Sequence, residues 1–184
     1  MSDARTNLSS SDGPAYIDVI SQHLVLLDPL ALDMLPVQLP ELSRLDSSSL
    51  LIALSKISKD VRRRNFGLRI GWCELPSLSP RTYTIDANSF DPVEPDDTHE
   101  DVFDIDCGTV VVVDVSALGA VAATLTWERY DLLLQQPIGD STLIEEMIRE
   151  VGGKRFAIVS GDINYPFAGD GIYRFREGMP KCVS

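Results

Sequence analysis

The sequence has few of the residues that usually carry chemistry. Among its 184 residues are three cysteines and two histidines, and aromatic residues make up 7%. Cys73, Cys107 and Cys182 are widely spaced and form no C-x-x-C pair, so we expect free thiols in a reducing compartment rather than a disulfide framework. The chain also lacks a Walker loop, a GxGxxG fingerprint, an HExxH helix and a nucleophile–base pair. We therefore predict no catalytic residue, no metal and no cofactor.

Long apolar runs and positive charges are also scarce. Residues 1–13 contain no apolar core of a signal peptide, and no run approaches the roughly 18 apolar residues that span a bilayer. We therefore expect a cytoplasmic protein without a membrane partner. The 16 Lys and Arg against 28 Asp and Glu give a net charge of -12. This balance disfavours nucleic acid, whose binding requires cations that neutralise phosphates, and it suits a basic protein partner.

What is present indicates strands with a few amphipathic helices. Strands are predicted where β-branched and aliphatic residues cluster, at residues 16–20, Leu24–Leu27, 66–72, Thr82–Ile85, 102–106, 109–115, Phe156–Ser160 and 172–175. Four valines at 110–113 indicate a strand that is buried on both faces. Apolar residues at helical spacing predict helices at 50–61, 127–136 and 142–151, and Ser116 is expected to cap a short turn at 117–121.

Two glycine-containing turns predict hairpins. The turn at 106–108 is expected to join strand 102–106 to strand 109–115, and the loop at 161–171 to join Phe156–Ser160 to strand 172–175. Glycine supplies the positive φ of a sharp reversal, and aspartate hydrogen-bonds its own backbone there. The stretch 156–175 is therefore predicted to be the closing hairpin of the fold.

The two halves of the chain also resemble each other. Residues 24–35 align with 110–121, with Asp28 and Asp114 at equivalent positions, and Tyr83 aligns with Tyr173. Chance similarity between apolar strands is the alternative explanation. We predict an α+β fold, antiparallel and β-rich, of two pseudo-repeated halves packed as one domain, each with one amphipathic helix on a sheet. The boundaries are a disordered tail at 1–14, a first half at 15–86, an acidic linker at 87–101 and a second half at 102–184.

Two short motifs in the second half carry a family resemblance. They are D-C-G-T at 106–109, followed by Asp114, and S-G at 160–161 followed by G-D-G-I-Y at 169–173. On these motifs the sequence resembles an uncharacterised bacterial family, catalogued as a domain of unknown function, with a terminal G-D-G-x-Y. The loop at 162–168 is longer than the pattern of that family. The resemblance implies a cytosolic, β-rich bacterial protein and adds no catalytic residue.

The loop near the C-terminus is the candidate binding site. Its candidate residues offer oxygen ligands or aromatic rings beside flexible glycines: Asp162, Asn164, Tyr165, Phe167, Asp170 and Tyr173. Aromatic side chains on a loop favour a partner-binding surface. The oxygen ligands favour a cation or small ligand, although the spacing of an EF-hand is absent. Turn formation, with the aromatic rings folded back over the core, explains the same residues without a ligand.

Three classes of function remain open. We favour a non-catalytic protein-interaction module, immunity-like or accessory, that shields a basic partner. The first alternative is a small-ligand or cation-binding domain that uses the 161–171 loop. The second is an enzyme in which Asp28, Asp114 or Asp170 serves as acid or base. An aspartate at the end of a strand more often caps the following turn, and that is the interpretation we favour for Asp28 and Asp114.

Overall fold

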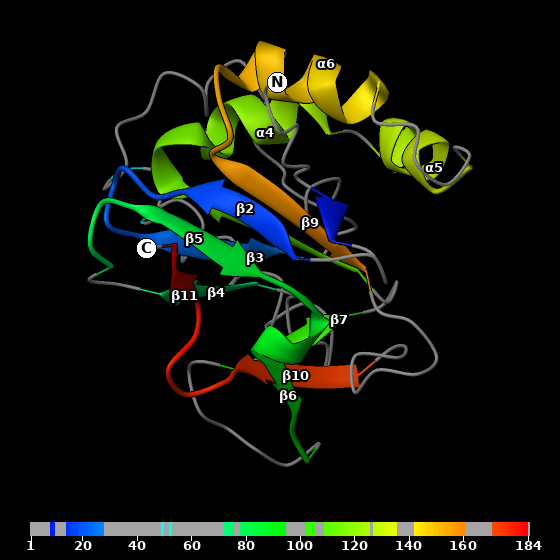
Figure 1. The fold of residues 1–184 in the computed structure, drawn as a ribbon. Helices are drawn as coiled ribbons and strands as arrows, with labels where there is room; N and C mark the ends of the chain where they lie inside the picture. The colour runs from blue at the N-terminus through cyan, green and yellow to red at the C-terminus, as the bar shows by residue number, and fades with distance from the viewer. Residues whose placement is uncertain are drawn as a thin grey trace.

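The protein is an α+β fold in which one central sheet is covered on both faces (Figure 1). The computed structural model describes residues 8–9, 14–27, 49, 52, 72–75, 78–94, 102–105, 109–125, 127–135, 142–160 and 171–183. Strands are β1 (Leu8–Ser9), β2 (Ala15–Asp18), β3 (Leu24–Leu27), β4 (Trp72–Leu75), β5 (Thr82–Ile85), β6 (Phe90–Pro92), β7 (Val102–Ile105), β8 (Thr109–Asp114), β9 (Phe156–Ser160), β10 (Gly171–Phe175) and β11 (Lys181–Cys182). Helices are η1 (Ala87–Ser89), η2 (Val115–Ala117), α4 (Leu118–Thr124), α5 (Trp127–Gln135) and α6 (Thr142–Val151).

The central sheet has the strand order β1-β9-β8-β3-β4. Its pairs are antiparallel except β1 and β9, which run parallel. Strand β8 lies in the middle, and its valines 110–113 are all fully buried. Because successive side chains of a strand point to opposite faces, the valine run requires cover on both sides. The sequence prediction of a strand buried on both faces is therefore confirmed.

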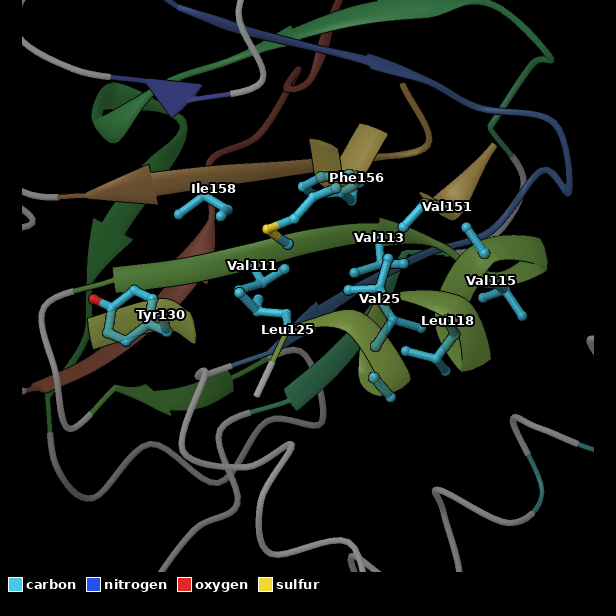
Figure 2. Packing of buried hydrophobic residues seen from close by; sticks show 14 of the residues in the cluster. Val25, Val111, Val113, Val115, Leu118, Leu125, Tyr130, Val151, Phe156 and Ile158 are labelled. Carbon is cyan, nitrogen blue, oxygen red and sulfur yellow. The ribbon is translucent and has the colours of Figure 1, made fainter. Parts of the chain in front are cut away.

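Helices cover one face of the central sheet. Val111 and Val113 of β8 point into a cluster with apolar residues of η2, α4, α5 and α6 (Figure 2). Tyr130 of α5 closes one end of this cluster, and its hydroxyl donates to Thr109 Oγ1 over 2.6 Å. A buried tyrosine usually needs such a partner for its hydroxyl. This bond fixes α5 to the first residue of β8.

Two small sheets cover the other face. Their strand orders are β11-β5-β2 and β6-β10-β7. Val110 and Val112 of β8 pack here against apolar residues of β2, β5, β6 and β10. Phe90 and Phe175 meet edge to face, with ring centroids 4.9 Å apart, a geometry that aromatic pairs prefer. In this second layer the C-terminal strands β10 and β11 thus pair with β6 and β5, which come from the first half of the chain.

Helices α5 and α6 occur where the sequence predicts them. Helix α6 buries Ile144, Met147 and Val151, at the spacing of one helical face. It ends at Val151, and the following Gly152 has a φ of +82°, a conformation that glycine adopts without steric cost. Helix α4 was expected only as a short turn at 117–121. It forms a buried helix because Leu118, Gly119, Val121 and Ala122 all lie against the core.

Both predicted hairpins are wrong. Strand β7 pairs with β10 in a small sheet, whereas β8 pairs with β3 and β9 in the central sheet. Strands β9 and β10, expected to form the closing hairpin, likewise belong to different sheets. Turn residues indicate that the chain reverses, but the partner of a strand depends on contacts that are distant in sequence. The local sequence pattern therefore did not predict the order of the strands in the sheets.

Two predicted boundaries also change. Residues 8–9, assigned to a disordered tail, form β1 and pair with β9. Residues 87–92, assigned to the acidic linker, form η1 and β6, and Phe90 is fully buried there. The described residues of the second half already include three α-helices, α4 to α6, where one was expected. The repeated strands β3 and β8 lie side by side and antiparallel. Of the predicted helix at 50–61, only Ile52 lies within the described residues, so the duplication stays a prediction.

Candidate functional site

Of the six predicted binding residues, only Tyr173 lies within the described residues. Asp162, Asn164, Tyr165, Phe167 and Asp170 lie outside the described residues. Tyr173 belongs to β10, where its backbone is in register with Pro92 and Phe103. Its side chain is 5% exposed and packs in the cluster between the sheets. Little of the Tyr173 side chain is therefore accessible to a partner, and its role in binding stays a prediction.

Asp114 ends β8 and is fully buried. Its Oδ2 accepts hydrogen bonds from the backbone N–H of Ile20 and Ser21, at 2.7 and 2.9 Å, and from Ser21 Oγ at 2.9 Å. Its Oδ1 accepts from the N–H of Ser116 at 2.9 Å, and also from Ser116 Oγ. These donors occupy the acceptor capacity of a carboxylate, so burial of the side chain is compensated.

The position of Asp114 identifies it as a cap. Its side chain satisfies the N–H of Ser116 at the start of η2, as predicted for an aspartate that follows a strand. The expectation that Ser116 caps this turn is wrong, because Asp114 is the capping residue. A carboxylate with no exposed surface does not reach a substrate in solvent. Of the other two proposed acid or base residues, Asp28 and Asp170, neither lies within the described residues.

Arg155 extends the same network to helix α6. Its Nη2 donates to the carbonyl of Val151 at 2.6 Å, and its Nη1 to Ser116 Oγ at 3.2 Å. The backbone carbonyl of Arg155 in turn accepts from the N–H of Asp114 at 2.8 Å. The guanidinium thus joins the last turn of α6 to the start of η2. These contacts of Arg155 therefore stabilise the fold.

The strongest candidate site is the exposed surface of α5 and α6, which we call the acidic helix pair. It is defined by exposed carboxylates on both helices: Glu128, Asp131, Glu145, Glu146 and Glu150. The same helices carry two cationic side chains, Arg129 and Arg149. Figure 1 shows α5 beside the end of the α4–α6 layer, away from the small sheets. The surface therefore has a local excess of negative charge.

An ion-pair network holds the two helices together. Arg129 of α5 contacts both oxygens of Glu150, with Nη1 2.9 Å from Oε2 and Nη2 3.2 Å from Oε1. Its Nη2 also lies 3.4 Å from Glu146 Oε2. The hydrogen bond from Arg129 is the main cause that lowers the pKa of Glu150 below its ordinary value of 4.5. Glu150 thus stays charged at neutral pH, and its side chain is partly exposed.

One apolar side chain lies among these charges. Leu132 of α5 is 56% exposed. Glu128, Asp131 and Gln135 are exposed at the neighbouring helical positions, four residues before, one before and three after it. The Nε2 of Gln135 donates to Asp131 Oδ2 over 2.7 Å, which orders this rim. Leu132 is thus an exposed apolar side chain with exposed polar residues at nearby positions of the same helix.

Sequence reasoning missed this surface. The signal was available, because Glu128, Asp131 and Leu132 follow helical spacing in a helix that was predicted. The contact between α5 and α6 through Arg129 could be obtained only from the structure. Within the described residues, no three His, Cys, Asp or Glu side chains gather in a way that could hold a metal ion. Nor does any helix in this part of the chain have the length and apolarity to cross a membrane.

Comparison with protein-family models, curated proteins and solved structures found no match to this chain. The resemblance to an uncharacterised bacterial family therefore stays a prediction.

Proposed function

We propose that the protein is a non-catalytic, cytoplasmic interaction module that binds a basic protein through the acidic helix pair. The observation that carries this proposal is the exposed Leu132 bracketed by Glu128 and Asp131 on α5. The net charge of -12 of the whole chain supports it. An immunity-like or accessory role, in which the chain shields its partner, is consistent with these features.

The charged residues and the apolar residue of this surface are expected to contribute to binding in different ways. Carboxylates raise the local concentration of a cationic partner and steer its approach. Leu132 supplies apolar area, and burial of one large aliphatic side chain contributes roughly 1.5–3 kcal/mol. Because the rim charges are exposed, each ion pair with the partner is expected to add about 0–1 kcal/mol. The leucine is therefore the expected centre of binding energy.

The intramolecular network indicates the geometry that suits this surface. Arg129 shows that a guanidinium fits between Glu146 and Glu150, which are one helical turn apart. Arg129 is the basic residue between Glu128 and Asp131 in α5, and its guanidinium contacts Glu150 of α6. A partner that presents arginine or lysine beside an apolar residue is thus complementary to α5.

Affinity capture with matched variants tests the proposal. The tagged protein is incubated with lysate of its source organism at low and at high salt. The triple variant Glu128→Gln, Asp131→Asn, Leu132→Ser removes the α5 surface. The control variant Glu94→Gln, Glu177→Gln removes two exposed carboxylates elsewhere on the molecule. Circular dichroism establishes that both variants are folded.

We expect the unchanged protein and the control to recover a basic protein at low salt, and the triple variant to lose it. Recovery should decline with added salt because exposed charges are screened. Recovery of no protein at low salt, or equal recovery by the triple variant, would overturn the proposal.

A further inference from the structure

Arg129 joins α5 to the two neighbouring helices. Its Nη1 and Nη2 lie 2.9 and 3.2 Å from the two carboxylate oxygens of Glu150 on α6, and its Nη2 lies 3.4 Å from Glu146 Oε2. Its Nη1 also donates to the carbonyl of Thr124, the last residue of α4, at 3.5 Å. A guanidinium is planar and its donors point in fixed directions. One side chain thus links α4, α5 and α6 and defines how they are oriented.

The carboxylates in this network remain accessible while the arginine is mostly covered. The side chain of Arg129 is 21% exposed, whereas those of Glu146 and Glu150 are 51% and 46% exposed. A carboxylate can accept several hydrogen bonds at once, so the contact with Arg129 does not exhaust either group. The ion pairs therefore keep two accessible carboxylates of α6 next to α5.

The core-facing side of α5 is held independently of Arg129. Tyr130 is buried and donates to Thr109 of β8 over 2.6 Å, and Leu133 packs against the same core. Residues three apart lie on one face of a helix, so these two residues attach α5 to the central sheet. Without Arg129, α5 is therefore expected to stay folded against the core but to lose the constraint on its tilt relative to α6.

The tilt of α5 matters because it carries the exposed apolar residue of the acidic helix pair. Leu132 follows Arg129 by three residues and is 56% exposed, so its position relative to the carboxylates of α6 depends on how α5 is held. A surface that already has its binding geometry loses less conformational entropy on association. Arg129 thus holds the apolar residue and the carboxylates in one arrangement before any partner binds.

We infer that Arg129 is a positioning residue of the acidic helix pair, which holds Leu132 beside the carboxylates of α6 for binding to a basic partner. This inference rests on the function proposed above. It predicts the opposite of what charge alone predicts. Replacement of Arg129 by a neutral residue removes one positive charge, so the net charge changes from -12 to -13. Added negative charge by itself attracts a cationic partner more strongly, whereas loss of the link between the helices weakens binding.

Two synthetic peptides of equal charge serve as probes. One is an amphipathic helical peptide of Lys and Leu, and the other has Ser in place of each Leu. Their dissociation constants at low salt are measured by fluorescence anisotropy for the unchanged full-length protein and for Arg129→Gln, Arg129→Lys and Arg149→Gln. Arg149 is exposed on α6, so Arg149→Gln is a control that makes the same change in charge. Circular dichroism and thermal unfolding establish that each variant is folded.

We expect Arg129→Gln to bind the Lys/Leu peptide about three- to tenfold more weakly than the unchanged protein, because the ordering of one or two side chains on binding corresponds to up to about one decade in affinity. Arg129→Lys retains the charge but not the fork of donors, so its affinity should be intermediate. Arg149→Gln should bind the Lys/Leu peptide equally or more tightly. The Lys/Ser peptide, which makes no apolar contact, should lose no affinity for Arg129→Gln.

Equal or tighter binding of the Lys/Leu peptide by Arg129→Gln, or an equal loss for both peptides, would overturn the inference. The same loss in Arg149→Gln would also overturn it. If Arg129→Gln does not fold, Arg129→Lys decides, and an affinity equal to that of the unchanged protein would contradict a positioning role. Failure of the proposed function gives a different result, in which Leu132→Ser binds the Lys/Leu peptide as tightly as the unchanged protein.

Discussion

Replacement of Asp114 by asparagine tests the network that positions the β2–β3 turn. The fully buried carboxylate accepts hydrogen bonds on both oxygens, from Ile20, Ser21 and Ser116. Asparagine retains one acceptor oxygen and turns an NH₂ group toward the remaining donors. Each buried donor that loses its acceptor costs about 1–3 kcal/mol. With one or two donors left unpaired, and with relief from burying a charge, we expect Asp114→Asn to lower the free energy of unfolding by about 2–3 kcal/mol.

Urea denaturation followed by far-ultraviolet circular dichroism measures this loss. Asp131→Asn is the matched control, because Asp131 is exposed on α5 and accepts one hydrogen bond from Gln135. We expect the control to change the unfolding free energy by less than about 0.5 kcal/mol. If Asp114→Asn costs no more than the control, the hydrogen bonds of Asp114 do not stabilise the β2–β3 turn.

Three further predictions concern the core and the ion pair. Tyr130→Phe removes a buried 2.6 Å hydrogen bond to β8 and should cost about 1–2 kcal/mol in urea denaturation; no loss would show that α5 is held by other contacts. Val111→Ala and Val112→Ala should each cost about 2 kcal/mol, because opposite faces of β8 are both covered; a loss in only one variant would contradict the two-sided core. The pKa of Glu150 is lowered in the folded state by its hydrogen bond from Arg129. Its stabilising contribution is therefore present above pH 4.5 and lost as the pH falls through the lowered pKa. Glu150→Gln should narrow the difference in stability between about pH 6 and about pH 3, and an unchanged difference would exclude this pair as a source of pH dependence.

Elements set by local pattern could be predicted from the sequence. Strands β3 and β5 have the predicted bounds, and so does α6, which spans Thr142–Val151. Period-2 and period-3.6 patterns report which side of an element faces the core, so they succeed for segments with one consistent environment. Helix α4 was missed because Ala and Gly residues give it weak periodicity, and the core covers it on most sides.

Properties that depend on distant contacts could not be predicted. The hairpin predicted around 106–108 would have paired β7 with β8, but β8 is flanked on both sides by β3 and β9. The composition of 87–101 indicated a linker, yet Phe90 within it is a core residue that contacts Phe175. An average over an acidic segment conceals a single buried aromatic side chain.

For the candidate sites too, features set by local sequence could be predicted and those set by distant contacts could not. The strand-end position of Asp114 predicted a cap, and the structure confirms it. Tyr173 was expected at a binding surface because it follows a glycine-rich loop, but strand alternation places its ring in the core. The acidic helix pair could be recognised only from the contact between Arg129 and Glu150, which joins the two helices. Helical spacing alone does not show which helices meet.

Site-specific photocrosslinking tests the acidic helix pair most directly. A photoreactive amino acid replaces Leu132 in one sample and the exposed Glu177 in another, and the adducts formed in the source organism are identified by mass spectrometry. The proposal predicts that position 132 forms an adduct with a basic protein, that position 177 does not, and that salt well above physiological ionic strength abolishes the adduct. The absence of any adduct at position 132, or the same adducts from both positions, would contradict it.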